Sequence, residues 1–468
     1  MYSYFDYSNE QDIQALVHQF EEMSLNGTVG FFETASFLRL LDYYESEFNL
    51  EKAHEVVRHA LIQHPYSAAL YIRKAALLFE SDRPDAALEC LGEAEMYDSS
   101  ELELYMLRAE ILTWKKQYDA ALEALETAMF HASKSDKYDV FISMANVYED
   151  MDQFDKVFAH LRKALLTNPK GEEALDKIWL AVELSEHYDE SIKLHNQILD
   201  IDAYSYMAWY NLGHAHLCKQ EYENAIEAFE FAFVIKEDFE FAYRDCGEAY
   251  FELEDYESAI KTYQKALEHI RPDSSIYLHI GQCFEELEDY PSAREHYLKA
   301  AKLNGQNPDV FYRLGECYAR EERWISAVSS YKKAVKLNNE NSKYVAGLAE
   351  AYYQLDKCTE ADVLFRKALI LDLSNNDIWV QYVSFLVDIE EYEEAYQMLE
   401  EADKHCESIE LLYCKVACLF YWGQRKEAAN LLLFALEEDF DMHTSLFELF
   451  PDLENEPEIL AVISGYGN

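Results

Sequence analysis

The sequence repeats itself with a period of 34 residues. Alanines in five consecutive segments show the register, because each follows the last by one period: Ala225, Ala259, Ala293, Ala327 and Ala361. A repeat of this length is one supersecondary unit that cannot bury its own apolar face. Neighbouring units must therefore stack, and we expect one elongated array instead of a single globular core.

Within each period, apolar residues recur in two stretches at helical spacing, separated by a short turn. In the unit that begins at Tyr206, Leu212 and Gly213 share one face of the first helix, and Ala225 and Phe229 share one face of the second. Glycine inside a helix costs roughly 1 kcal/mol relative to alanine, so its recurrence predicts close approach of the paired helix. The glycines in register are Gly213, Gly247, Gly281 and Gly315. These positions are expected to form the core.

The pattern W-x2-L-G-x2-Y, followed by spaced A, F and A, resembles the tetratricopeptide repeat. Twelve units are assigned by a mid-repeat residue: Ala53, Ala87, Ala121, Val157, Ser191, Ala225, Ala259, Ala293, Ala327, Ala361, Ala395 and Ala428. Two extra residues lie between Ala121 and Val157, and one is missing between Ala395 and Ala428. The resemblance implies an all-α fold, a right-handed α-α superhelical solenoid of about twelve helix pairs. The acidic, tyrosine-rich composition favours a long array of bacterial type.

The expected array covers residues 34–442. Terminal repeats need a covering element, so residues 1–33 are expected to form an N-terminal capping helix and residues 443–468 C-terminal capping helices. One departure stands out inside the array: Trp179 occupies the place of the glycine. Looser or shifted packing is predicted around it.

The chain is strongly acidic, with 90 acidic against 40 basic residues and a net charge of −50. Such a chain repels phosphates and lacks a basic stripe, which argues against direct binding to nucleic acid. No apolar run approaches the roughly 20 residues that span a bilayer, and the start of the sequence lacks the features of a secretion signal. The nine cysteines have no framework spacing, which favours reduced thiols and a cytoplasmic location.

No motif of an enzyme stands out. A glycine-rich phosphate loop, HExxH and GxSxG are all missing. Cys406, Cys414 and Cys418 with His405 lack the paired spacing of a zinc site, and His214 with Cys218 is interpreted as packing. We therefore expect no catalytic residue, no metal and no cofactor. The repeats also take up nearly all of the sequence, which leaves no room for a catalytic domain.

The resemblance further implies that the first helix of each pair lines a concave groove that faces a partner. Carried over onto this sequence, the partner-binding groove comprises Glu110, Asn146, Glu149, Asp150, Asp176, Tyr210, His214, Phe241, Glu248, Phe251, Glu252, Glu285, Tyr312, Glu316, Glu350 and Tyr353. Carboxylates would pair with lysine and arginine, and aromatic faces would stack on their stems. The expected partner is a basic protein or peptide, and neither nucleic acid nor membrane.

The function predicted from these features is a non-catalytic intracellular scaffold or adaptor for protein–protein interaction. The alternative is an acidic regulatory protein that mimics nucleic acid and occupies the basic site of a nucleic-acid enzyme. A simpler explanation of the charge also stays open, since acidic helix faces keep a protein solvated.

Overall fold

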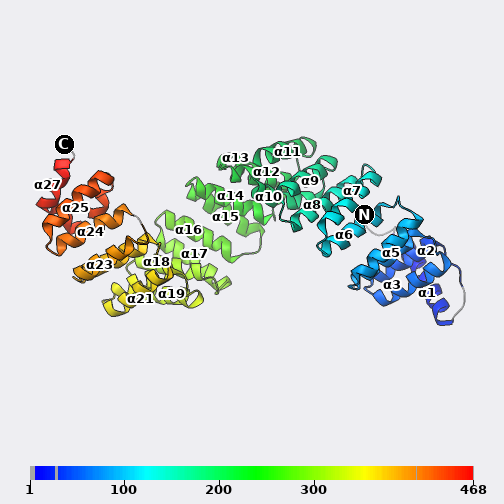
Figure 1. Cartoon of the computed structure of the whole chain (residues 1–468), viewed down its shortest axis with the longest axis horizontal. Helices are drawn as coiled ribbons and strands as arrows, with labels where there is room; N and C mark the ends of the chain where they lie inside the picture. Colours follow the sequence, from blue (N-terminus) through cyan, green and yellow to red (C-terminus); the bar gives the residue numbers. More distant parts are fainter. Residues whose placement is uncertain (1–5, 27–29, 407, 467–468) are drawn as a thin grey trace. The chain divides into compact units, whose positions relative to one another are not determined.

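The computed structural model describes residues 6–26, 30–406 and 408–466, so the first five residues of the expected N-terminal cap and residues 27–29 lie outside it. The described residues form 27 α-helices and one 3-10 helix, which follow one another along the chain (Figure 1). Contacts divide the chain into two compact units, Met1–Asp245 and Cys246–Asn468. The predicted all-α fold of sequential helix pairs is confirmed.

Unit 1 contains six complete helix pairs after a single leading helix. Its helices are α1 Asp6–Asn26, α2 Thr34–Ser46, α3 Leu50–Gln63, α4 Ala68–Glu80, α5 Pro84–Tyr97, α6 Leu102–Trp114, α7 Tyr118–His131, α8 Lys137–Asp150, α9 Phe154–Thr167, α10 Glu172–Ser185, α11 Tyr188–Ile201, α12 Tyr206–Cys218 and α13 Tyr222–Ile235. The division between the units falls inside α14, Glu240–Glu252.

Unit 2 contains the remaining pairs and the C-terminal helices. After α14 they are α15 Tyr256–His269, α16 Ser274–Glu286, α17 Tyr290–Leu303, α18 Pro308–Arg320, α19 Trp324–Leu337, α20 Ser342–Tyr353, α21 Cys358–Leu371, α22 Asn376–Asp388, α23 Tyr392–Ala402, α24 Ile409–Tyr421, α25 Arg425–Glu438, α26 His443–Leu449, the 3-10 helix η1 Pro451–Asn455 and α27 Pro457–Tyr466.

In each helix pair, one residue with a positive φ, in the left-handed region, lies in the turn that joins the first helix to the second. The twelve positions carry the sequence register into the backbone: Phe48, Asp82, Lys116, Asp152, Glu186, Gln220, Glu254, Glu288, Glu322, Asp356, Glu390 and Gly423. Their spacing lengthens by two residues before Asp152 and shortens by one before Gly423. Both irregularities fall where the sequence predicts them, which confirms twelve helix pairs.

The glycines in register lie beneath aromatic rings of the second helix. A Cβ atom added at Gly213 would lie 2.7 Å from the ring of Phe229, and one at Gly315 would lie 2.5 Å from that of Tyr331. Gly281 is covered in the same way by Tyr297, whose side chain is fully buried. A Cβ at such a distance forces the ring to move, so the predicted close approach of the paired helices is confirmed.

The helix pair that contains Trp179 solves the same packing problem in another way. Trp179 is half-buried and meets His214 of α12 edge to face, with ring centroids 5.4 Å apart. Where the next repeat has Phe229, this pair has the smaller His195, which is fully buried. Helix α10 shares few contacts with its own partner α11 and packs more extensively on α9 and α12. The shifted packing predicted at Trp179 is therefore present.

His195 makes this pair sensitive to acid. Its Nδ1 lies 2.9 Å from the carbonyl oxygen of Ser191, and burial lowers the pKa of the imidazole to about 4. An unfolded histidine titrates near 6.5, so the unfolded state gains a proton first as the pH falls. The stabilisation that neutral His195 provides is therefore complete above about pH 6.5 and is lost as the pH falls from 6.5 to 4.

We expect the free energy of unfolding of unit 1 to fall by about 2 kcal/mol more between pH 7 and pH 5 in the natural protein than in His195→Leu. Urea titrations at both pH values, followed by amide exchange in α11, measure this difference. Carboxylates titrate in both proteins and cancel in the comparison. Equal pH dependence of the two proteins would contradict the role given to His195.

Both ends of the array are covered by apolar helices. Val17, Phe20 and Met23 of α1 are buried in one cluster with Phe37 and other residues of the first pair. At the other end, the last helix pair shares its core with the C-terminal helices, through the buried residues Leu446, Phe450, Leu453 and Ile459. These helices lie where the capping segments are expected, while the boundaries assigned to the caps stay predictions.

Candidate functional site

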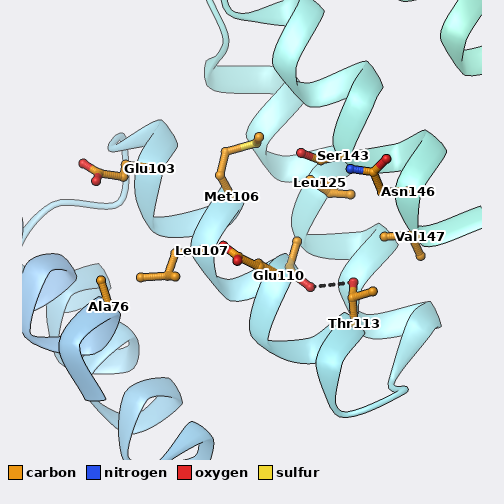
Figure 2. A pocket seen from close by; sticks show the side chains of 11 residues that line it. Ala76, Glu103, Met106, Leu107, Glu110, Thr113, Leu125, Ser143, Asn146 and Val147 are labelled. Carbon is orange, nitrogen blue, oxygen red and sulfur yellow. Dashed lines mark hydrogen bonds between the residues drawn. The ribbon is translucent and has the colours of Figure 1, made fainter. Parts of the chain in front are cut away.

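The first helices of unit 1 form a hollow of about 420 Å³. Residues from α4, α6, α7 and α8 line it: Ala76, Glu103, Met106, Leu107, Ala109, Glu110, Thr113, Leu125, Ser143, Asn146 and Val147. Figure 2 shows side chains of α6, among them Met106 and Glu110, opposite Ser143 and Asn146 of α8. Three consecutive first helices thus contribute to one surface, which we call the inner hollow.

The inner hollow combines an apolar floor with an acidic rim. Met106, Leu107 and Val147 supply the apolar surface. Glu103 and Glu110 are exposed, and neither forms an ion pair with any residue in the described part of the chain. Unpaired carboxylates beside apolar surface suit a ligand that carries both a positive charge and an aliphatic stem.

The acid at the neighbouring edge of this surface is partly neutralised by Lys177, which sequence reasoning missed. Its Nζ donates to Oδ1 of Asn146 at 2.6 Å and lies 3.7 Å from carboxylate oxygens of Glu149 and Glu173. Lys177 follows the predicted groove residue Asp176 by one position and reaches back from α10 to α8. A flexible four-carbon stem makes such a contact invisible to helical periodicity.

An aromatic cluster occupies the end of unit 1. Tyr210 and His214 are both buried, with ring centroids 6.2 Å apart, and the ring of Tyr210 lies 6.4 Å from that of Phe241. Burial lowers the pKa of His214 and raises the pKa of Cys218, its neighbour at 3.7 Å, to about 11. Histidine and cysteine are thus packing residues here, as predicted. Phe241 is 56% exposed and is the member of this cluster open to a partner.

In unit 2, several predicted groove acids serve as acceptors for buried tyrosines. The hydroxyl of Tyr297 donates to Glu285, and that of Tyr331 donates to Glu316. Glu285 also receives Nη1 of Arg313 at 3.2 Å. These tyrosines are the ones that cover Gly281 and Gly315. The carboxylates therefore satisfy hydroxyl groups of the core as well as facing the first-helix surface.

Other acids of unit 2 have no cation beside them. Desolvation by the surrounding protein, followed by the neighbouring carboxylate of Glu252, raises the pKa of Glu248, although its side chain still reaches solvent. Burial raises the pKa of Glu350, which accepts a hydrogen bond from Nε2 of Gln354 at 2.9 Å. No described residue forms an ion pair with Glu248, Glu252 or Glu350. A bound cation would lower the pKa values of Glu248 and Glu350, so these two acids can accept a positively charged group.

The sixteen predicted groove residues all lie on first helices, eight in each unit. In unit 1, Glu110, Asp150, Asp176 and Phe241 are exposed, Asn146 and Glu149 are half-buried, and Tyr210 and His214 are buried. In unit 2, Glu248 and Glu252 are exposed, and Phe251, Glu285, Tyr312, Glu316, Glu350 and Tyr353 are half-buried. The structure brings Glu110 and Asn146 together in the inner hollow. Their use by a partner stays a prediction.

The described residues contain no group of three or more His, Cys, Asp and Glu side chains placed to hold a metal. None of the nine cysteines, all of which lie in the described residues, forms a disulfide, and burial raises the pKa of Cys283 and of Cys317 to about 12. Among the described helices, none has the length and apolar character that crossing a bilayer requires.

A family model described as Cilia and flagella-associated protein 70 C-terminal domain matches residues 184–412, just under half of the chain. Together with the twelve pairs in one register, this match decides the class. The repeats are of the tetratricopeptide type. Repeats of this type are protein-interaction scaffolds and are typically non-catalytic. The bacterial type of array expected from the style of the sequence gains no support from this match.

Solved structures of other tetratricopeptide repeat proteins are similar in part. YrrB, described as having an unusual peptide-binding site, is 17% identical, with a TM-score of 0.35 over 39% of this chain and 94% of YrrB. The Cut9–Hcn1 complex gives 15% identity and a TM-score of 0.39 over 92% of this chain and 94% of the other. PilF of Pseudomonas aeruginosa gives 21% identity and 0.38 over 46% and 97%. No curated protein matches the sequence.

Proposed function

We propose that this protein is a non-catalytic scaffold that holds a basic segment of a partner protein on its first-helix surface. The observation that carries the proposal is the inner hollow, where the unpaired carboxylates of Glu103 and Glu110 stand over Met106 and Leu107. Arginine and lysine fit this chemistry, because the charged head stays at the wet rim while the stem covers apolar surface.

The groove acids of unit 2 support the same preference independently. Glu248 and Glu252 are one helical turn apart and like-charged, which is unfavourable until a cation binds between them. Glu285 and Glu316, in contrast, are already engaged by tyrosine hydroxyls. We therefore place the stronger electrostatic attraction of unit 2 on α14, with Phe251 as the nearby aromatic surface.

Charge removal at the inner hollow tests the proposal. We expect Glu103→Gln with Glu110→Gln to weaken binding of a labelled peptide of Lys, Arg and Leu about five- to tenfold, because two exposed charges contribute up to about 1 kcal/mol each. Fluorescence anisotropy at low and at physiological salt measures the affinity, and binding by the natural protein should weaken as salt rises.

Glu126→Gln is the matched control, since Glu126 is an exposed acid of α7 that does not line the inner hollow. It should leave the affinity unchanged. If the double variant binds the peptide as tightly as the natural protein, or if Glu126→Gln has the same effect, the inner hollow is not the binding surface.

We propose a cytoplasmic location because none of the nine cysteines forms a disulfide. The description of the matching family model adds a cilium or flagellum as a second compartment. Imaging of a tagged chain in a ciliated or flagellated cell distinguishes diffuse cytoplasmic signal from enrichment at that organelle.

A further inference from the structure

A second cavity in unit 1 has the opposite electrostatic character. It measures about 480 Å³ and is lined by residues of the second helix α3, of α4, and of the second helix α5 with the residue before it. Its basic lining residues are His54, Arg58, Lys74 and Arg83, and its one acidic lining residue is Glu93. It shares no lining residue with the inner hollow. We call it the basic cavity.

This concentration of positive charge is unusual for the chain, in which acidic residues outnumber basic ones 90 to 40. Basic residues nearby are paired: Lys52 lies 2.8 Å from Glu55, and Arg73 lies 2.7 Å from Asp42. Arg58, Lys74 and Arg83, in contrast, form no ion pair with any residue that the structure describes. The three cations and the single carboxylate of Glu93 thus leave the cavity with an excess of positive charge that no ion pair neutralises.

The surroundings of His54 are also positively charged. Its Nε2 lies 2.9 Å from the hydroxyl of Ser81, and burial followed by the charge of Arg83 lowers the pKa of the imidazole. His54 is therefore a neutral hydrogen-bonding group at pH 7, and Arg58, Lys74 and Arg83 carry the charge. Lys74 is half-buried, with Nζ 5.8 Å from the ring centroid of Tyr71, which restricts it to the cavity wall.

Apolar side chains complete the wall. Val57 and Leu78 are buried, and Leu61 and Tyr71 are half-buried, so the cavity offers aliphatic and aromatic surface between its cations. Inorganic phosphate would pair with the charges but would leave this surface wet. A peptide with alternating carboxylates and aliphatic side chains would use both features, because arginine binds carboxylates through two parallel hydrogen bonds.

We propose that the basic cavity binds a short acidic segment of a partner protein, with its carboxylates on Arg58, Lys74 and Arg83 and an aliphatic side chain against Leu61. The evidence is charge complementarity, and it is independent of the inner hollow. The scaffold would then hold two partner segments of opposite charge, a basic one on the first-helix surface and an acidic one in the basic cavity.

The test uses a labelled peptide of Glu, Asp and Leu, with a peptide of Gln, Asn and Leu as its uncharged counterpart. We expect the acidic peptide alone to bind, with affinity that falls as salt rises. Arg58→Gln with Arg83→Gln should weaken its binding at least about tenfold, while Arg39→Gln, an exposed arginine of α2 outside the cavity, should not. Binding of the basic peptide should be the same in all these proteins.

Equal affinity of the double variant and the natural protein for the acidic peptide would overturn the proposal. So would binding of inorganic phosphate without binding of the peptide. Self-association of the natural protein that the double variant loses would identify a second copy as the occupant and would likewise overturn it. Thermal unfolding confirms that the variants fold, and Arg58→Gln alone repeats the test at an exposed side chain if the double variant is destabilised.

Discussion

Gly281→Ala should lower the free energy of unfolding of unit 2 by about 1–3 kcal/mol, although alanine is the better helix former by up to about 1 kcal/mol. The added Cβ would collide with the ring of Tyr297, which is fully buried and has no space to retreat into. Well-packed cores respond to overfilling with rotated side chains and shifted backbone. Urea and thermal unfolding measure the change.

Gly92→Ala is the matched control. Gly92 lies in α5, and apart from its chain neighbours and the backbone of its own helix no atom lies within 4 Å of an added Cβ. Alanine there should raise stability by about 0.5–1 kcal/mol, which is the effect of helix propensity alone. In a Tyr297→Leu background, the cost of Gly281→Ala should shrink. If Gly281→Ala and Gly92→Ala change stability in the same direction, the ring does not fill the place of the missing side chain.

Glu285→Ala should destabilise unit 2 by about 1–3 kcal/mol, because it removes the acceptor of a buried hydroxyl. The hydroxyl of Tyr297 donates to this carboxylate, and Arg313 pairs with it at 3.2 Å. Both groups would lose this carboxylate. The neighbouring Glu286 is exposed, so Glu286→Ala should change stability by less than about 0.5 kcal/mol.

Glu285 accepts from the hydroxyl of Tyr297 and pairs with Arg313. A Tyr297→Phe background separates these two roles. Without the hydroxyl there is no donor to satisfy, so Glu285→Ala should cost less than in the natural protein. A double-mutant cycle measures this coupling. Equal costs of Glu285→Ala and Glu286→Ala would show that Glu285 is a free surface acid, as its groove position alone suggests.

The architecture could be predicted because the repeat encodes it redundantly. Gly281 and Ala293 recur with their equivalents at one spacing, and each repeat confirms the register of the next. The pair around Trp179 could be flagged but not solved from sequence, because its solution depends on a neighbour. The large ring turns toward His214 of the next pair, while His195 fills the smaller space left behind.

The candidate site was less predictable from the sequence. A groove position fixes where the backbone of a residue lies, but it does not fix what the side chain contacts. Glu110 and Asn146 line the same inner hollow because they lie on consecutive first helices, α6 and α8. Tyr210 sits at a groove position yet is buried by the aromatic rings around it. Glu285 accepts a hydrogen bond from a tyrosine hydroxyl of the second helix, and Lys177 donates one to a residue of the preceding repeat. Contacts of this kind depend on packing that periodicity does not encode.

The most direct test of the central proposal maps where a basic segment lies. A peptide of Lys, Arg and Leu that carries a photoreactive group, crosslinked to the full chain and analysed by mass spectrometry, reports the helices it touches. The inner hollow predicts crosslinks on α6 and α8, near Met106, Glu110 and Asn146, that fade as salt rises. Crosslinks on α9 and α11 instead, or a pattern that is the same with and without Glu103 and Glu110, would contradict the proposed function.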